Sequence, residues 1–148
     1  MGKIDFTDQY FMKQALQQAR EAFDKDEVPV GAVIVSEGAI ITKAHNMTET
    51  LNDVTAHAEM LAITAASEQL GSKYLNNCTL YVTLEPCTMC AGALNWAQIG
   101  KIVYGAADEK RGYRRLNPLP LHPRTEIIGG VLESECTQLV KQFFATKR

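Results

Sequence analysis

The sequence contains no apolar run that approaches the roughly 18 residues of a membrane-spanning helix. Its first eight residues mix charged and polar groups, so we expect no signal peptide. Only four of the 148 residues are cysteines, which is too few for a disulfide scaffold. We therefore expect a cytoplasmic protein with reduced cysteines and no membrane contact, in which a cysteine cluster indicates a metal site or catalysis.

The chain also lacks a large net charge: its formal net charge is only −2 at pH 7. Hydrophobic residues make up 46% of the chain and charged residues 22%, a composition that argues against disorder. We expect residues 1–148 to form a single domain. The charge is unevenly spread: residues 101–148 hold nine basic and five acidic residues, which gives +4 there and −6 in the first hundred. This bias indicates either a solvated surface or a local site for an anionic partner.

Helical and β-strand patterns alternate along the sequence. A helix is predicted over 8–23, then a hairpin of strands 30–35 and 39–42. Thr55 is expected to cap a helix that Gly71 ends, and a further helix is expected from Cys87 to Ala97. The other predictions are strands 79–84, 101–104 and 125–128, a loop over 108–123, and a final helix 133–144. This order predicts an α/β fold, a three-layer α/β/α sandwich with a mixed central sheet.

A cysteine pair stands at one of the predicted helix starts. Cys87 and Cys90 are three residues apart, so their sulfurs share a helix face, and the positive end of the helix favours thiolates. A lone pair of this spacing fits a redox disulfide or half of a zinc site. We expect Cys78 and Cys136 to be core residues, which leaves His57, at the other helix start, as the partner of the pair.

Three protein ligands leave the fourth position of a tetrahedral zinc ion to water, as in catalytic zinc sites. Zinc lowers the pKa of that water to near 7. Glu59 follows His57 by two residues and is suited to carry protons rather than to bind the metal. The sequence therefore predicts one Zn²⁺ per chain, held by His57, Cys87 and Cys90, with Glu59 as the catalytic residue.

His-x-Glu followed by Pro-Cys-x-x-Cys resembles the signature of zinc-dependent nucleobase deaminases. Over about residues 8–148 the chain is similar to bacterial tRNA-specific adenosine deaminases, most clearly in four stretches: 27–33, 55–59, 80–87 and the tail from Gly130. The resemblance implies a cytidine-deaminase-like fold and the conversion of a wobble adenosine to inosine in a tRNA anticodon loop, which is a hydrolytic deamination. A single-stranded loop suits this reaction because its bases leave the stack at low cost.

The same resemblance implies a substrate site around the metal. Its expected members are Asn46, Glu27, Val30, Ala58, Pro86 and Asp108. Asn46 could equally be a turn residue, because it opens a polar loop. If the substrate is RNA, the expected phosphate-binding residues are Lys110, Arg111, Arg114, Arg115, Lys141, Lys147 and Arg148.

A homodimer is also expected, since the predicted helix 87–97 is apolar almost all round and the related enzymes look like dimers. Two features depart from the tRNA enzymes. The sequence 93–97, with Trp96, is closer to guanine deaminases, and the loop after Asp108 is shortened.

The sequence therefore leaves a free-base or nucleoside deaminase, with guanine as its first substrate, as the alternative. Two further classes are weighed against deamination. One is a non-catalytic zinc or RNA-binding module, which has no need of Glu59, and the other is a redox Cys-x-x-Cys protein, which would hold no metal.

Overall fold

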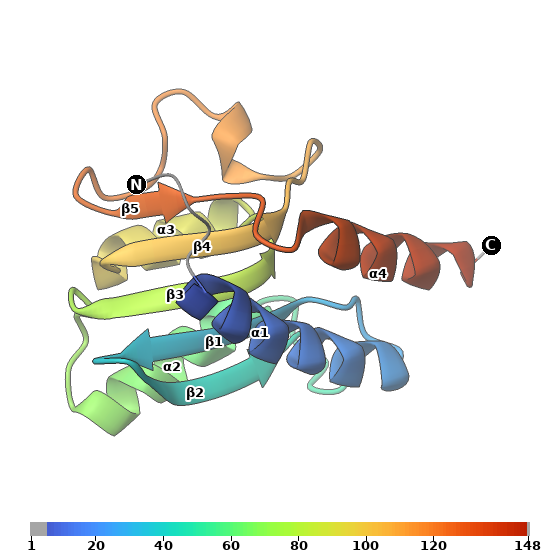
Figure 1. The fold of residues 1–148 in the computed structure, drawn as a ribbon, viewed down its shortest axis with the longest axis horizontal. Coiled ribbons are helices and arrows are strands. Elements are labelled where there is room, and N and C mark those ends of the chain that lie inside the picture. Colours follow the sequence, from blue (N-terminus) through green and yellow to red (C-terminus); the bar gives the residue numbers. More distant parts are fainter. Residues whose placement is uncertain (1–5, 148) are drawn as a thin grey trace.

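The computed structural model describes residues 6–147 (Figure 1). Its helices are α1 (Phe6–Asp24), α2 (Ala58–Leu70), α3 (Thr88–Ala97) and α4 (Glu133–Ala145), with a short 3₁₀ helix, η1 (Tyr113–Arg115). Its strands are β1 (Gly31–Ser36), β2 (Ala39–His45), β3 (Cys78–Leu84), β4 (Lys101–Ala106) and β5 (Glu126–Ile128). Within the described range, no helix combines the length and the apolar character needed to cross a membrane.

The five strands form one mixed sheet in the order β2-β1-β3-β4-β5. Strand β1 runs antiparallel to both of its neighbours, β2 and β3. Strands β3, β4 and β5 are parallel to one another. The prediction of a mixed sheet that begins with an antiparallel hairpin is therefore confirmed.

Helices cover both faces of the sheet, α1 and α4 on one and α2 and α3 on the other (Figure 1). The strand residues alternate between these two layers, as the period of a β-strand requires. Val33, Tyr81 and Val103 face α1, whereas Ile34 and Leu80 face α2 and α3. The three-layer α/β/α sandwich is confirmed.

Several predicted element boundaries differ from the structure, and two of them have a clear local reason. Helix α2 begins at Ala58 with His57 as its N-cap, and not after Thr55. The reason is local: the carboxylate of Asp53 accepts hydrogen bonds from both the amide and the hydroxyl of Thr55, which holds Thr55 in a turn. Strand β2 continues three residues beyond Thr42, because its backbone stays paired with β1 as far as His45.

Glycine at position 31 lets α1 lie close against the sheet. A Cβ atom there would overlap the backbone of Ala15 and Ala19 in α1. The Gly31 amide also donates a hydrogen bond to the hydroxyl of Thr83 in β3, at 3.1 Å. These contacts fix the start of β1 beside the end of β3, where the candidate site lies.

Candidate active site

Four connecting segments meet at one end of the sheet, where β1 begins and β2, β3 and β4 end. The pairing of Gly31 with His45 brings the start of β1 beside the end of β2. The pairing of Ala32 with Val82, and of Leu84 with Ala106, adds the carboxyl ends of β3 and β4. The segments 25–30, 46–57, 85–87 and 107–112 are therefore neighbours, and all the residues that the sequence predicted for the site lie in or next to them.

The three predicted metal ligands lie together. The Nδ1 atom of His57 is 3.6 Å from the sulfur of Cys87 and 3.5 Å from that of Cys90. All three donor atoms lie within 4.8 Å of one another. His57 is the N-cap of α2 and Cys87 the N-cap of α3, so two helix starts carry the cluster.

This donor set fits a tetrahedral zinc ion. Zinc bonds of about 2.3 Å to sulfur and about 2.0–2.1 Å to nitrogen imply a nitrogen–sulfur separation of about 3.6 Å. The two separations in the structure agree with that value. Two sulfurs and one imidazole are also the ligand chemistry that zinc prefers, and they leave one tetrahedral position without a protein ligand.

The pKa values of the two thiols are shifted in opposite directions. A hydrogen bond with Cys90 lowers the pKa of Cys87 to about 4, and the hydrogen bond with His57 acts in the same direction, while burial opposes both. The pKa of Cys90 is raised, first by that hydrogen bond and then by burial. Cys87 is therefore a thiolate at neutral pH, which is the form that binds a metal.

Glu59 is buried beside the cluster. Its side chain is in the first turn of α2 and the residue is only 3% exposed. Burial raises the pKa of Glu59 to about 7, although hydrogen bonds from its own amide and from Cys90 favour the carboxylate. The structure thus brings Glu59 against the predicted ligands, as expected for a group that exchanges protons there.

The buried side chain of Glu27 fixes the loop 46–57 through hydrogen bonds. Its carboxylate is fully buried and accepts hydrogen bonds from the amides of Glu49 and Thr50, at 3.1 and 2.6 Å, and from the Thr50 hydroxyl. Burial opposes ionisation, but these hydrogen bonds outweigh it, so the pKa of Glu27 is lowered. Both carboxylate oxygens are therefore engaged by the loop, and Glu27 shapes the site through that loop.

Asn46 is held at the start of the same loop. Its side-chain amide donates to the carbonyl of Val28 at 3.3 Å, and its side-chain oxygen accepts from the amide of Thr48. Its backbone amide donates to the carbonyl of Val30. Asn46 thus has the contacts of a turn residue and also joins the loop to the segment before β1.

The remaining predicted substrate residues are distributed around the metal cluster. Ala58 is the first residue of α2, where helix amides lack partners within the helix. Pro86 is buried and its carbonyl accepts a hydrogen bond from the amide of Tyr113. Asp108 lies at the rim, where its carboxylate caps the amides of Lys110 and Arg111.

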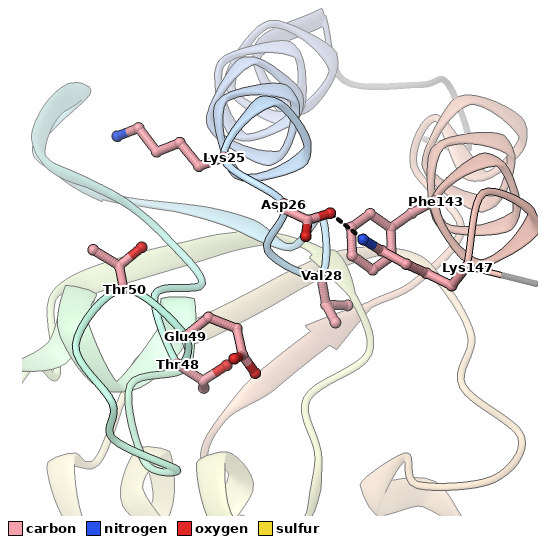
Figure 2. Close-up of a pocket in the computed structure, with 8 residues that line it drawn as sticks. All are labelled: Lys25, Asp26, Val28, Thr48, Glu49, Thr50, Phe143 and Lys147. Carbon is pink, nitrogen blue, oxygen red and sulfur yellow. Dashed lines mark hydrogen bonds and ion pairs between the residues drawn. The ribbon is translucent and has the colours of Figure 1, made fainter.

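A pocket of about 580 Å³ borders the loop on the side of α4. Figure 2 shows Thr48, Glu49 and Thr50 on one side of it, and Phe143 of α4 and Lys147, just beyond the end of α4, on the other. Lys147 forms an ion pair with Asp26 and lies over the ring of Phe143. The expected partner of Lys147 in the tail, Arg148, lies outside the described residues.

The buried carboxylate of Glu85 was not among the expected site residues. It lies between β3 and the N-cap Cys87, is 2% exposed, and binds the segment that follows β4. An acid at the end of a buried strand was the available signal, since buried acids are rare unless they are paired. Its partner Arg114, one of the residues expected to bind phosphate, has a side chain that is 46% exposed and pairs with Glu85 through Nε.

Comparisons with known proteins agree on one family. A sequence model described as the cytidine and deoxycytidylate deaminase zinc-binding region matches residues 6–106. A tRNA-specific adenosine deaminase of Aquifex aeolicus is 49% identical, and the match covers 100% of this chain and 97% of that protein.

Two solved structures carry the comparison further. One, from a study of A-to-I editing by tRNA:A34 deaminases at the wobble position of transfer RNA, is 45% identical with a TM-score of 0.83, and covers 88% of this chain and 98% of the other. A guanine deaminase of Bacillus subtilis is 42% identical with a TM-score of 0.65, and the match covers 70% of this chain and 66% of the other.

Proposed function

We propose that this chain, which belongs to the cytidine and deoxycytidylate deaminase family and within it to the tRNA-specific adenosine deaminases, converts the wobble adenosine of a tRNA anticodon loop to inosine. The observation that carries the proposal is the end-to-end similarity to a tRNA-specific adenosine deaminase, at 49% identity. The His57, Cys87 and Cys90 cluster, with Glu59 buried beside it, provides the chemistry that such a reaction needs.

The reaction is a hydrolysis at C6 of adenine. Water adds to that carbon, the bond to the amino nitrogen breaks, ammonia leaves and a carbonyl remains. Zinc, when bound by His57, Cys87 and Cys90, supplies the Lewis acidity that activates water at neutral pH. Glu59 moves the protons: it takes one from the attacking water and gives it to the adjacent ring nitrogen, and later takes one from the added hydroxyl group and gives it to the departing amino group.

A single-stranded RNA loop fits the surroundings of the site. The segment 108–115 carries four basic residues, and its Gly112 pairs with Cys87 of the metal cluster. Of those four, Lys110, Arg111 and Arg115 are exposed and form no ion pair among residues 6–147, so they are the ones we assign to phosphates. Lys147 lines the pocket that borders the loop 46–57.

Guanine is the second candidate substrate. It is favoured by the 42% identity to the guanine deaminase of B. subtilis. That match covers 66% of the guanine deaminase, however, whereas the match to the A. aeolicus tRNA enzyme covers 97%. The comparison over the whole length therefore favours RNA.

We further propose that the chain acts as a cytoplasmic homodimer. Trp96 on α3 is 84% exposed, although the helix has an apolar composition, and this excludes a core role within the chain. An exposed tryptophan on an apolar helix is typical of an interface. Light scattering at high micromolar concentration tests this, and a particle of one chain's mass would contradict it.

The substrate is tested by incubating the purified zinc protein with an anticodon stem-loop, guanine, cytosine and adenosine. We expect inosine at the wobble position of the RNA. Guanine turnover without inosine in the RNA would contradict the proposed substrate and leave the zinc chemistry intact.

A further inference from the structure

We propose that Glu85 is a positioning residue that fixes the segment 108–115 beside the metal cluster and thereby sets the affinity of the site for its RNA. The part of this inference that concerns affinity rests on the proposed RNA substrate. The part that concerns the position of the segment rests on the contacts of Glu85 alone.

Three donors from one segment converge on this carboxylate. Its Oε1 atom accepts a hydrogen bond from the amide of Asp108 at 3.0 Å and pairs with Nε of Arg114 at 3.1 Å. Its Oε2 atom accepts from the amide of Arg114 at 2.9 Å. Only 1% of the Glu85 side chain is exposed, so water cannot replace these donors without moving the segment.

Gly112 shows how closely the segment is held. A Cβ atom at this position would overlap the carboxylate of Glu85 and the carbonyl of Asp108. Its φ of −65° is open to any residue, so glycine is required here for space rather than for backbone freedom. Gly112 also pairs with Cys87, and the next amide, of Tyr113, donates to Pro86. The carboxylate therefore holds the segment at the point where it meets the metal cluster.

Arg114 links the Glu85 carboxylate to Tyr104 of β4. Its guanidinium lies 5.6 Å from the centre of the Tyr104 ring while it pairs with Glu85. The neighbouring Arg111 and Arg115 are exposed. All three arginines are exposed, but only Arg114 of the three pairs with a carboxylate among residues 6–147.

The proposal predicts that loss of these contacts changes RNA binding and not the chemical step. The segment supplies none of His57, Cys87, Cys90 and Glu59, so its displacement weakens RNA binding and leaves the reaction intact. Glu85→Gln keeps the shape of the side chain, but its new NH₂ group replaces a carboxylate oxygen. That NH₂ group then faces an N–H donor of the segment and leaves it without an acceptor. We expect the KM for an anticodon stem-loop to rise by roughly tenfold, the effect of one unsatisfied buried donor, with kcat and zinc content unchanged.

The experiment compares wild type, Glu85→Gln and Glu126→Gln, the last being an exposed glutamate of β5 that serves as a matched control. Zinc content, kcat and KM are measured on each zinc-loaded protein. Native trypsin cleavage after Lys110, Arg111 and Arg115 then reports the position of the segment independently of any substrate. We expect faster cleavage at these three sites in Glu85→Gln alone.

Arg114→Gln is a second variant in case Glu85→Gln does not fold, because it removes the ion pair and keeps the backbone hydrogen bonds. It should change KM and cleavage in the same direction by a smaller factor. Unchanged cleavage and KM, or a loss of kcat at constant KM, would overturn the proposal. If wild type fails to deaminate the stem-loop, the proposed function is wrong, and the trypsin result still decides whether Glu85 positions the segment.

Discussion

The centre of the site is held by two helix starts, whereas the loops at its rim are held by two buried glutamates. At the centre, His57 and Cys87 are the N-caps of α2 and α3, and the donor atoms of the cluster face one another directly. At the rim, Glu27 binds the loop 46–57 and Glu85 binds the segment 108–115. In the proposed function, the centre carries out the reaction and the loops at the rim select the molecule that reaches it.

The two glutamates also differ from each other. Glu27 is met only by neutral donors, two amides and a hydroxyl. Glu85 is met by two amides and the guanidinium of Arg114. A carboxylate that bonds to amides holds backbone, so each glutamate fixes the path of a loop rather than the conformation of one side chain. The predictions below test the contrast between centre and rim.

The largest effect is expected from removal of the metal ligands. In the double variant Cys87→Ser, Cys90→Ser, zinc should fall from about one per chain to near zero, since one histidine cannot hold it. Deamination should fall to background, and the region where α2 meets α3 should lose stability. Full zinc occupancy measured by elemental analysis would show that the ligands lie elsewhere.

The second prediction separates the catalyst from the ligands. Glu59→Gln should keep its zinc and its fold, and should lose about 10²–10⁴ in kcat because proton transfer is lost. Zinc analysis and single-turnover kinetics measure the two quantities separately. Near-normal turnover in a zinc-loaded Glu59→Gln protein would remove Glu59 from its assigned role.

The third prediction concerns the rim. Glu27→Gln should cost about 1–3 kcal/mol in the free energy of unfolding, because a buried donor then faces a donor. The KM for the RNA should rise while zinc content stays at one per chain. Glu37→Gln, in the exposed turn between β1 and β2, is the matched control. Equal denaturation curves for Glu27→Gln and wild type would contradict the anchoring role.

The same anchor predicts a pH dependence. The pKa of Glu27 is lower in the folded than in the unfolded protein, so its carboxylate stabilises the fold above the unfolded pKa of about 4.3. This contribution is lost as the pH falls below that value through the lower, folded pKa. Between pH 6 and pH 3, wild type should lose more stability than Glu27→Gln, and parallel curves would count against the assignment.

The smallest effect is expected from the tail. Removing the charges of Lys147 and Arg148 should weaken RNA binding and reduce the slope of log K against log salt by roughly 0.7–0.9 for each phosphate that is no longer bound. Zinc content should not change. Lys73→Gln, remote in sequence from the rim loops, is the control. An unaltered salt slope would mean that the tail does not touch phosphate.

The sequence predicted that His57, Cys87 and Cys90 lie together because its signals are local. His57 and Cys87 are helix N-caps, Cys90 lies in the first turn of α3, and the strands β1, β3 and β4 are short apolar runs in the sequence. The helix start expected at Thr55 failed because Asp53, two residues earlier, competes for its hydroxyl and amide. Local capping rules do not show which of two neighbouring polar residues will prevail.

The rim could not be predicted in this way. Glu27 meets partners 22 and 23 residues away, and Glu85 meets partners 23 and 29 residues away, through polar contacts that leave no periodic pattern. Arg114 is exposed like Arg111 and Arg115, and only its ion pair with Glu85 distinguishes it from them. The contacts of Glu27 and Glu85 form only after the sheet has folded and brought these segments together at the ends of its strands.

If a metal-centred deaminase site in this protein serves an RNA loop, RNA and guanine should differ both in turnover and in their dependence on salt. Deamination of an anticodon stem-loop and of guanine is followed at two salt concentrations with the same zinc-loaded protein. We predict inosine at the wobble position, a KM for the RNA that rises with salt, and little or no turnover of guanine. Efficient guanine turnover with no inosine in the RNA would contradict the account.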